Sequence, residues 1–145
     1  MNPTPKGWPR LSSAVFYEDA SAAIDFLCRA FAFTVRLRVD GEGGRVEHSE
    51  LTYGEALVMV SSPKPELPGR ARFRSPRLVD GANTQALCII VDDVDAHCAD
   101  ARVAGAQIVH EPVTHDHGPE YWADRTYLAL DLEGHAWWFM QRVRG

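Results

Sequence analysis

A weak internal repeat constrains this chain more than any other feature of its sequence. Residues 15–35 (VFYEDASAAIDFLCRAFAFTV) and residues 89–109 (IIVDDVDAHCADARVAGAQIV) follow one design when they are set 74 positions apart. In each copy, an apolar run leads into two acidic residues, an alanine-rich amphipathic stretch, a small-residue break and a second apolar run. A shared order of elements at a fixed offset indicates two similar structural units.

The acidic residues before each amphipathic stretch predict where a helix begins. Asp19 and Asp93 are good N-cap residues, and negative charge is favourable at the positive end of a helix dipole. Apolar side chains then recur from Ala23 to Ala30 at the spacing of one helix face, and the second copy repeats the pattern.

Glycine-marked turns between apolar runs predict further strands after each helix. In the first half these strands span residues 33–39, 46–53 and 56–61. In the second half they span 107–110, 125–130 and 135–141, with a long polar loop after residue 110. Each half therefore has the order β-α-β-β-β, and the fold class is α+β with two paired βαβββ modules.

A chain of 145 residues buries one sizeable core and cannot hold two large domains. Module one spans about 10–61, a linker spans 62–83, and module two spans about 84–143. The linker has four prolines and five basic residues against two acidic ones. It is interpreted as a solvated connection, and the alternative is a lid or an anion-contacting loop.

Composition narrows the class of protein. The formal charge of −5 gives no reason to expect nucleic acid or an anionic membrane as a partner. No apolar run approaches a membrane span, and the N-terminus has no signal-peptide core. The cysteines, Cys28, Cys88 and Cys98, are interpreted as buried small apolar residues. These features predict a soluble cytoplasmic protein.

Four stretches in order resemble the vicinal oxygen chelate superfamily, which includes glyoxalase I, extradiol dioxygenases and bleomycin-resistance proteins. They are Tyr17–Phe33, Glu50–Tyr53, Ile90–Gly105 and Asp131–Phe139, the last reading DLEGHAWWF. The resemblance covers nearly the whole chain as one domain, residues 1–145. It implies curved, mostly antiparallel, cup-like sheets. It also implies a homodimer in which the sheets of one subunit complete clefts against the other.

Enzymes of this superfamily place one metal ligand on the first strand and one on the last strand of each module. Carried over by motif spacing, these positions are Ser12, Glu50, Ala86 and Trp138. Alanine and tryptophan supply no donor, and one carboxylate does not hold a catalytic metal. We therefore predict no cofactor, and the departure resembles the metal-free bleomycin-resistance members.

A divalent metal ion is the alternative. His48 and Glu50 face the same side of a strand, so both could bind a metal that acts as a Lewis acid. Other residues that could contribute are Gln85, Cys88, His110, His115 and His117, the histidines lying in the loop predicted before the last hairpin. The chain would then be a glyoxalase-type (lactoylglutathione lyase-like) lyase or a dioxygenase.

If no metal is bound, the cup-like sheets are predicted to form a binding site for a small molecule. Trp138 would form an aromatic wall suited to flat apolar or cationic ligands, and Glu50 would pair with a ligand cation. Tyr121 and Trp122, adjacent in a polar loop, form a second candidate surface, although they could instead seal a dimer. The candidate ligand-binding residues are Ser12, Phe16, His48, Glu50, Tyr121, Trp122 and Trp138. Trp137, on the opposite strand face, is predicted to pack in the core.

The sequence favours a binding protein that sequesters an aromatic or cationic compound, such as an antibiotic, over an enzyme. It contains no nucleophile elbow and no phosphate-binding glycine loop, so catalytic residues are not assigned. A third hypothesis is a scaffold module whose pocket is filled by Phe16 and Trp138.

Overall fold

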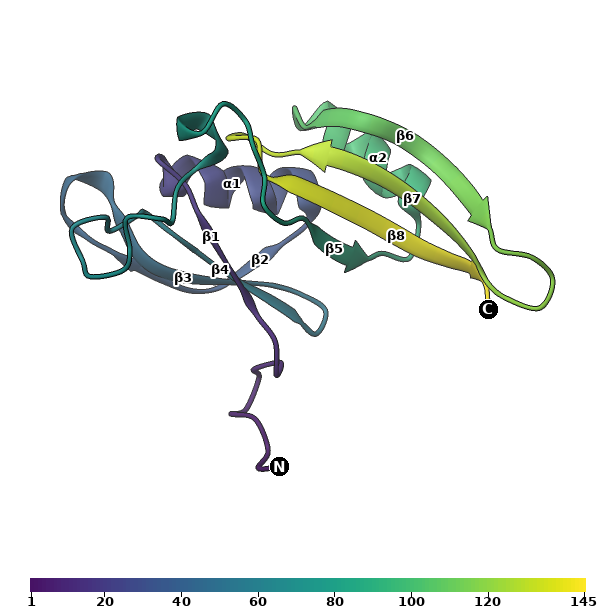
Figure 1. The fold of residues 1–145 in the computed structure, drawn as a ribbon, viewed down its shortest axis with the longest axis horizontal. Coiled ribbons are helices and arrows are strands. Elements are labelled where there is room, and N and C mark those ends of the chain that lie inside the picture. Colours follow the sequence, from purple (N-terminus) through teal and green to yellow (C-terminus); the bar gives the residue numbers. More distant parts are fainter.

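The computed structural model describes all 145 residues, which form two four-stranded sheets and two helices (Figure 1). The first module contains β1 (Ser13–Phe16), α1 (Ala20–Phe31), β2 (Thr34–Asp40), β3 (Val46–Tyr53) and β4 (Ala56–Ser61). The second contains β5 (Leu87–Ile90), α2 (Val94–Val103), β6 (Gln107–Asp116), β7 (Ala123–Leu130) and β8 (Ala136–Arg144). Short 3-10 turns lie at Glu42–Gly44 and Pro76–Leu78. The predicted α+β fold of two βαβββ modules is confirmed.

The two sheets have the same topology. Sheet A has the order β1-β4-β3-β2 and sheet B the order β5-β8-β7-β6. The first strand of each module pairs in parallel with the last, and the remaining pairs are antiparallel. β1 begins at Ser13 and β5 at Leu87, 74 positions later, so the offset found in the sequence is also the structural one. Neither sheet closes on itself.

Both helices begin where the acidic residues predict. The Asp19 carboxylate accepts a hydrogen bond from the Ala22 amide at 3.0 Å, and Asp93 accepts one from the Ala96 amide at 2.9 Å. Each bond satisfies an amide that has no partner within the first turn of its helix. The local sequence is therefore sufficient to fix both helix starts.

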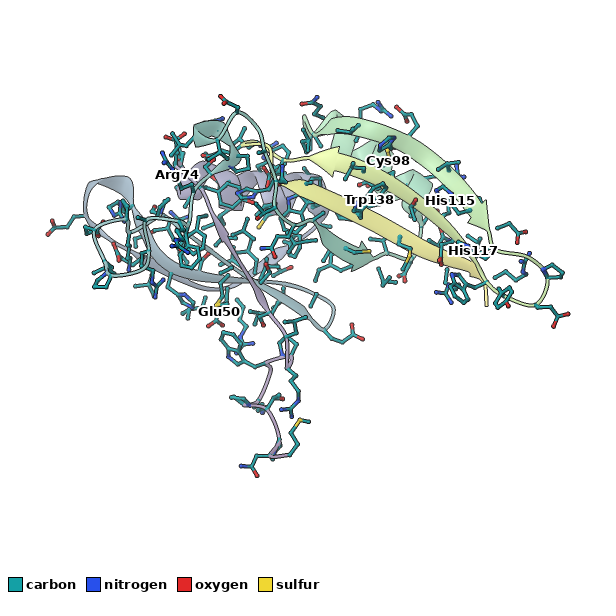
Figure 2. The ribbon with its side chains drawn as sticks, in the orientation of Figure 1. Glu50, Arg74, Cys98, His115, His117 and Trp138 are labelled. Atoms are coloured by element: carbon teal, nitrogen blue, oxygen red, sulfur yellow. The ribbon has the colours of Figure 1, made fainter.

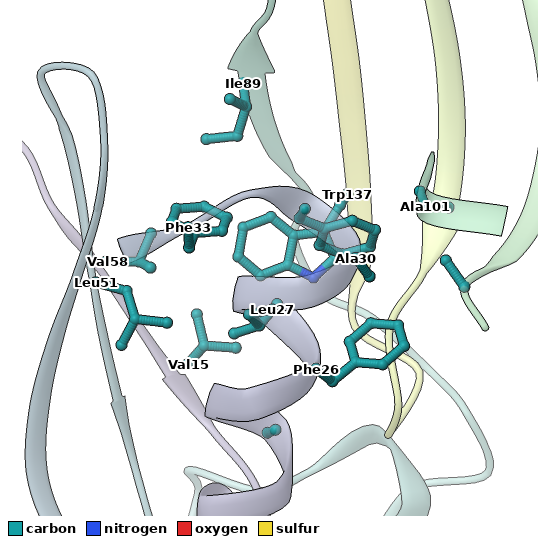
Figure 3. Packing of buried hydrophobic residues seen from close by; sticks show 14 of the residues in the cluster. Val15, Phe26, Leu27, Ala30, Phe33, Leu51, Val58, Ile89, Ala101 and Trp137 are labelled. Atoms are coloured by element: carbon teal, nitrogen blue, oxygen red, sulfur yellow. The ribbon is translucent and has the colours of Figure 1, made fainter. Parts of the chain in front are cut away.

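α1 joins the two modules because it packs against sheet B as well as sheet A (Figure 3). The ring of Phe31, at the end of α1, lies 4.8 Å from Phe139 and 5.7 Å from Trp137 on β8. Trp137 is fully buried, which confirms its predicted place in the core. The modules share one hydrophobic core, so neither buries its apolar surface alone.

A buried carboxylate in the turn between β7 and β8 holds this junction. Asp131 accepts hydrogen bonds from the Tyr17 hydroxyl at 2.6 Å and from the Trp137 indole N–H at 2.9 Å. Its other oxygen accepts the amides of residues 133–135. Burial, and then the charge of Asp131, raises the pKa of Tyr17 well above its usual value. The hydroxyl therefore stays protonated and donates.

Glu133, two residues further along, ties three segments together. Its carboxylate accepts the amides of Glu18 and Asp19, at 2.9 and 2.8 Å, just before α1. It also accepts a hydrogen bond from the hydroxyl of Ser75 in the linker. A buried carboxylate with several donors is well compensated. The turn thus positions α1 and the linker relative to sheet B.

The prediction of a polar loop after residue 110 is wrong. β6 continues to Asp116, and residues 113–116 pair with residues 123–126 of β7. Irregular pairing between His110 and Val113 accommodates Pro112, which cannot donate a ladder hydrogen bond. His110 and His115 therefore lie on a strand. The prediction that Cys88 is buried is also wrong, because its side chain is exposed. Cys98 is buried.

Neither helix has the length and apolarity needed to cross a bilayer.

Candidate functional site

Each sheet has one side packed on the helices and one side turned away from them. Along β8, Trp137 and Phe139 are buried in the core, so Trp138 and Met140 point to the opposite side. We name these outer sides face A and face B after their sheets. Face A includes Phe16, Leu37, His48, Glu50 and Met59, and face B includes Cys88, Ile90, His110, Trp138 and Met140. The candidate residues of the two β-sheets lie on these faces.

Glu50 is buried and already paired within the chain. It lies on β3, the third strand of its module rather than the last. One carboxylate oxygen is 3.2 Å from Arg36 Nε, and the other is 3.2 Å from His48 Nε2. An irregularity of β2 between Val35 and Leu37 accompanies the placement of Arg36 beside Glu50. Arg36 of the chain itself therefore occupies the role that the sequence assigned to a ligand cation.

The other three positions of the quartet do not gather around Glu50 in one chain. Ser12 directly precedes β1, and its hydroxyl is buried with no hydrogen-bond partner. Ala86 directly precedes β5, and Trp138 lies on β8. Figure 2 shows Glu50 and Trp138 on different sheets, well apart. Within one chain, then, the four positions do not share a site.

These residues do not fit a metal ion. Two of the four positions have no donor atom, and both oxygens of Glu50 already contact Arg36 and His48. No group of three or more His, Cys, Asp or Glu side chains is placed to hold a metal. His115 and His117 lie at the far end of sheet B, away from Glu50 (Figure 2).

Phe16 and His48 lie together beneath the linker. A cavity of about 320 Å³ is lined by both residues, by Met59 on β4 and by linker residues up to Phe73. The Phe16 and Phe73 rings are stacked, with centroids 4.9 Å apart and planes at 4°. Phe73 thus holds the linker over β1, although most of the linker residues are exposed to solvent, as a solvated connection predicts.

Trp138 is the aromatic centre of face B. Its indole is partly exposed and stacks on the ring of His110, with centroids 5.9 Å apart and planes at 8°. Cys88 is its partner on β5 and Leu128 its partner on β7. No segment of the chain covers this face as the linker covers β1.

Tyr121 and Trp122 lie in the loop between β6 and β7, at the end of sheet B furthest from sheet A (Figure 1). Tyr121 is 64% exposed. Trp122 packs against Arg142, whose guanidinium carbon lies 5.4 Å from the ring centroid, and against His117. One chain does not bring this pair to Phe16 and His48.

The sequence reasoning missed Phe73 and His135. Phe73 stacks on Phe16, and His135 donates a hydrogen bond from Nε2 to the Phe16 carbonyl at 2.8 Å. A lone aromatic residue among arginines, in the stretch RARFR, was the available signal for Phe73. His135 had no comparable signal, because its partner lies 119 positions earlier.

Comparisons with known proteins agree with this geometry. Residues 11–139 match the family described as the Glyoxalase/Bleomycin resistance protein/Dioxygenase superfamily. An uncharacterized protein of Mycobacterium bovis is 32% identical over 94% of this chain and 85% of its own length. The crystal structure of TioX from Micromonospora sp. ML1 is 31% identical, with a TM-score of 0.67 over 92% of this chain and 95% of TioX. A glyoxalase/bleomycin resistance protein/dioxygenase from Nocardioides is 14% identical, with a TM-score of 0.66 over 100% of this chain and 88% of its own; it shows the fold alone.

Proposed function

Because the chain belongs to the Glyoxalase/Bleomycin resistance protein/Dioxygenase superfamily, we propose that it is a metal-independent binding protein for a small aromatic or cationic compound, such as an antibiotic. The observation that carries the proposal is face B. There a partly exposed tryptophan, Trp138, stands where motif spacing puts a metal ligand in related enzymes. Flat apolar rings and organic cations bind indole through stacking and cation–π contact.

Each residue has a defined part in this proposal. His110 stacks on Trp138 and restricts the orientation of the indole, so less conformational freedom is lost on binding. Cys88 and Leu128, paired with Trp138 across the sheet, extend the surface beside the ring. Glu50, paired with Arg36 and in contact with His48, contributes polarity on face A.

The proposal includes a homodimer in which face A of one copy covers face B of the other. Face B exposes Ile90 (58%) and Val113 (46%), while face A exposes Leu37 (43%) and Val39 (45%). Apolar residues grouped on a sheet face favour burial against a partner. The contact would place Phe16 and His48 of one copy near Trp138 of the other, and so unite candidate residues that one chain keeps apart.

The proposal also places the protein in the cytoplasm. Cys28, Cys88 and Cys98 are all free thiols, and Cys88 is exposed. Partial desolvation by neighbouring groups, and then the charge of Asp124, raises the pKa of the Cys88 thiol and so reduces its thiolate fraction. Free exposed thiols are typical of reducing compartments.

Fluorescence titration with proflavine, a flat cationic dye, tests the proposal. Proflavine should quench the tryptophan emission of the wild type, and Trp138→Ala should weaken binding about tenfold through lost stacking. Trp138→Phe should retain most of the affinity, and Trp8→Phe, which changes a tryptophan in the N-terminal segment, is the matched control. Equal affinity in the wild type and in Trp138→Ala would remove face B from the proposal.

A metal-content assay tests the enzyme alternative, a lyase or dioxygenase that uses Glu50 and His48. Protein purified without added ions should contain far less than one divalent ion per chain. Near-stoichiometric metal that disappears in Glu50→Gln would replace the binding proposal with the metal-dependent one.

A further inference from the structure

A second cavity lies at the junction of the two modules, on the side of β1 next to β5. Its volume is about 760 Å³, the larger of the two cavities that the linker helps to form. Its walls are β1, linker residues between 68 and 83, and Thr84, Gln85, Leu87 and His135. None of the residues of face B lines this cavity; Phe16, which the proposed dimer would bring near Trp138, is the one candidate ligand-binding residue that does.

The lining is positively charged. Arg70, Arg72 and Arg74 all line the cavity, together with His135, and no aspartate or glutamate does. This is unusual in a chain whose formal charge is −5. A recess with one sign of charge concentrates ligands of the opposite sign.

The three guanidinium groups have no partner in the chain. None of them takes part in an ion pair or donates a side-chain hydrogen bond, and Arg70 only lies over the Phe73 ring, 5.9 Å from its centroid. Most other arginines pair with a carboxylate, as Arg125 does with Asp95 and Arg144 with Asp116. The exceptions outside the cavity are Arg10 and Arg29. Three unpaired arginines therefore line this cavity, and Arg70 also borders the smaller one.

The backbone that carries these arginines is anchored at alternate residues. Phe73, between Arg72 and Arg74, stacks on Phe16, and Ser75 donates its hydroxyl hydrogen bond to the buried Glu133. Ser75 is fully buried. Anchors on both sides of Arg74 hold its backbone in place, which lowers the ordering cost of binding. Figure 2 shows Arg74 on the linker, apart from Trp138.

The rest of the lining is apolar or uncharged. Phe16, Phe73, Val79 and Leu87 supply apolar surface. The Asn83 amide nitrogen donates to the Gly134 carbonyl, and its oxygen accepts the Ala136 amide, so this side chain fixes the rim. A ligand that matches these walls combines a flat apolar body with an anionic group.

We propose that the junction cavity, with Arg70, Arg72 and Arg74 free of carboxylate partners, binds an organic anion that carries an aromatic ring. Guanidinium groups bind carboxylate and phosphate through paired, charge-assisted hydrogen bonds, and both anions share this chemistry. The ring lies against the apolar wall that includes Phe16 and Phe73. This site has the charge preference opposite to that proposed for face B.

Isothermal titration with four naphthalene compounds tests the charge preference. 1-Naphthoate and 1-naphthyl phosphate are the anions, 1-naphthylmethanol is the neutral match, and 1-naphthylmethylammonium is the cation. Both anions should bind at least about tenfold more tightly than the other two, and more weakly as salt increases. Tighter binding of the phosphate would assign a dianionic group, and tighter binding of the carboxylate a monoanionic one. Equal binding of the neutral or cationic compound would overturn the proposal.

Charge-matched variants locate the site. Arg72→Gln/Arg74→Gln should lose at least about tenfold in anion affinity, whereas Arg10→Gln/Arg29→Gln, with the same loss of charge, should not. Arg72→Lys/Arg74→Lys should recover part of the affinity. The single Arg72→Gln and Arg74→Gln variants carry the test if circular dichroism shows the double variant unfolded. Equal losses in the two Gln double variants, or unchanged affinity in the first, would overturn the proposal. Trp138→Ala should leave anion binding unchanged, which separates this outcome from that of face B.

Discussion

Faces A and B arise from two copies of one design, yet they differ in how the chain completes them. On face A, the linker lies over β1, Phe73 stacks on Phe16, and Glu50 is paired by Arg36 and His48. Face B has no such cover, and Ile90 and Trp138 lie at its open surface. The same topology therefore yields one face that the chain covers in part, along β1, and one without such a cover.

The difference depends on the single connection that follows module one. The linker lies over β1 because Glu133 of module two holds Ser75. Two modules of the same topology thus differ through the segment that joins them.

Removing the anchor of the linker should have the largest effect. Glu133→Ala leaves the amides of Glu18 and Asp19 and the Ser75 hydroxyl without their acceptor. Loss of a buried carboxylate with these partners should lower the free energy of unfolding by about 3–5 kcal/mol. Chemical denaturation of the wild type and the variant measures this free energy. The control is Asp100→Ala on the exposed side of α2, where no measurable loss is expected; similar losses in both variants would contradict the anchor.

Charging the open face should have an intermediate effect, on association rather than folding. Ile90→Lys puts a cation on face B and should weaken the proposed dimer at least about tenfold. Sedimentation across a concentration series measures the dissociation constant. Val103→Lys makes the same change at a 90% exposed position at the end of α2 and should leave the dimer intact. A wild type that remains monomeric at high concentration would show that face B is free of a second copy.

The smallest effect should come from the side of sheet B that faces the helices. His97 on α2 accepts the Tyr127 hydroxyl at Nδ1, 2.6 Å away, and donates from Nε2 to the Phe31 carbonyl at 3.3 Å. Burial lowers the pKa of His97 below its usual value of 6.5, although the Phe31 carbonyl and Asp100 act in the opposite direction. The unfolded chain therefore binds this proton more readily than the folded chain.

Stability should accordingly be complete above about pH 6.5 and fall as the pH decreases towards the lower pKa of the folded state. The free energy of unfolding, measured from pH 7.5 to pH 5, should decrease less steeply in His97→Gln than in the wild type. His115→Gln, an exposed histidine on β6, should keep the wild-type slope. Identical slopes in the wild type and His97→Gln would show that this histidine binds its proton equally well in the folded and the unfolded chain, so that folding does not lower its pKa.

Much of the fold could be predicted from local pattern. Asp19 and Asp93 begin the helices as capping residues, β3 and β4 have the predicted bounds, and Trp137 is in the core. These features depend on residues within one or two turns of the chain. Propensity and periodicity act over that range, so these features can be predicted from the sequence.

The candidate site was only partly predictable. Phe16, His48 and Trp138 were selected by strand parity, and the structure places them on the outer faces of the sheets. The pairing of Glu50 with Arg36 was not foreseen, because an irregularity in β2 changes the register that parity assumes. The strand character of residues 113–116 was hidden by Pro112 and by polar side chains.

The sequence by itself determined a duplicated βαβββ design, its helix starts and the residue types at the former metal positions. Only the tertiary structure decided that Asp131 and Glu133 hold the junction, that the linker covers β1, and that three unpaired arginines line one cavity. The reason is physical. Each of these outcomes joins groups that lie far apart in the chain, such as Tyr17 and Asp131, 114 positions apart. Such contacts form only when both modules pack on one core, and no local pattern encodes them.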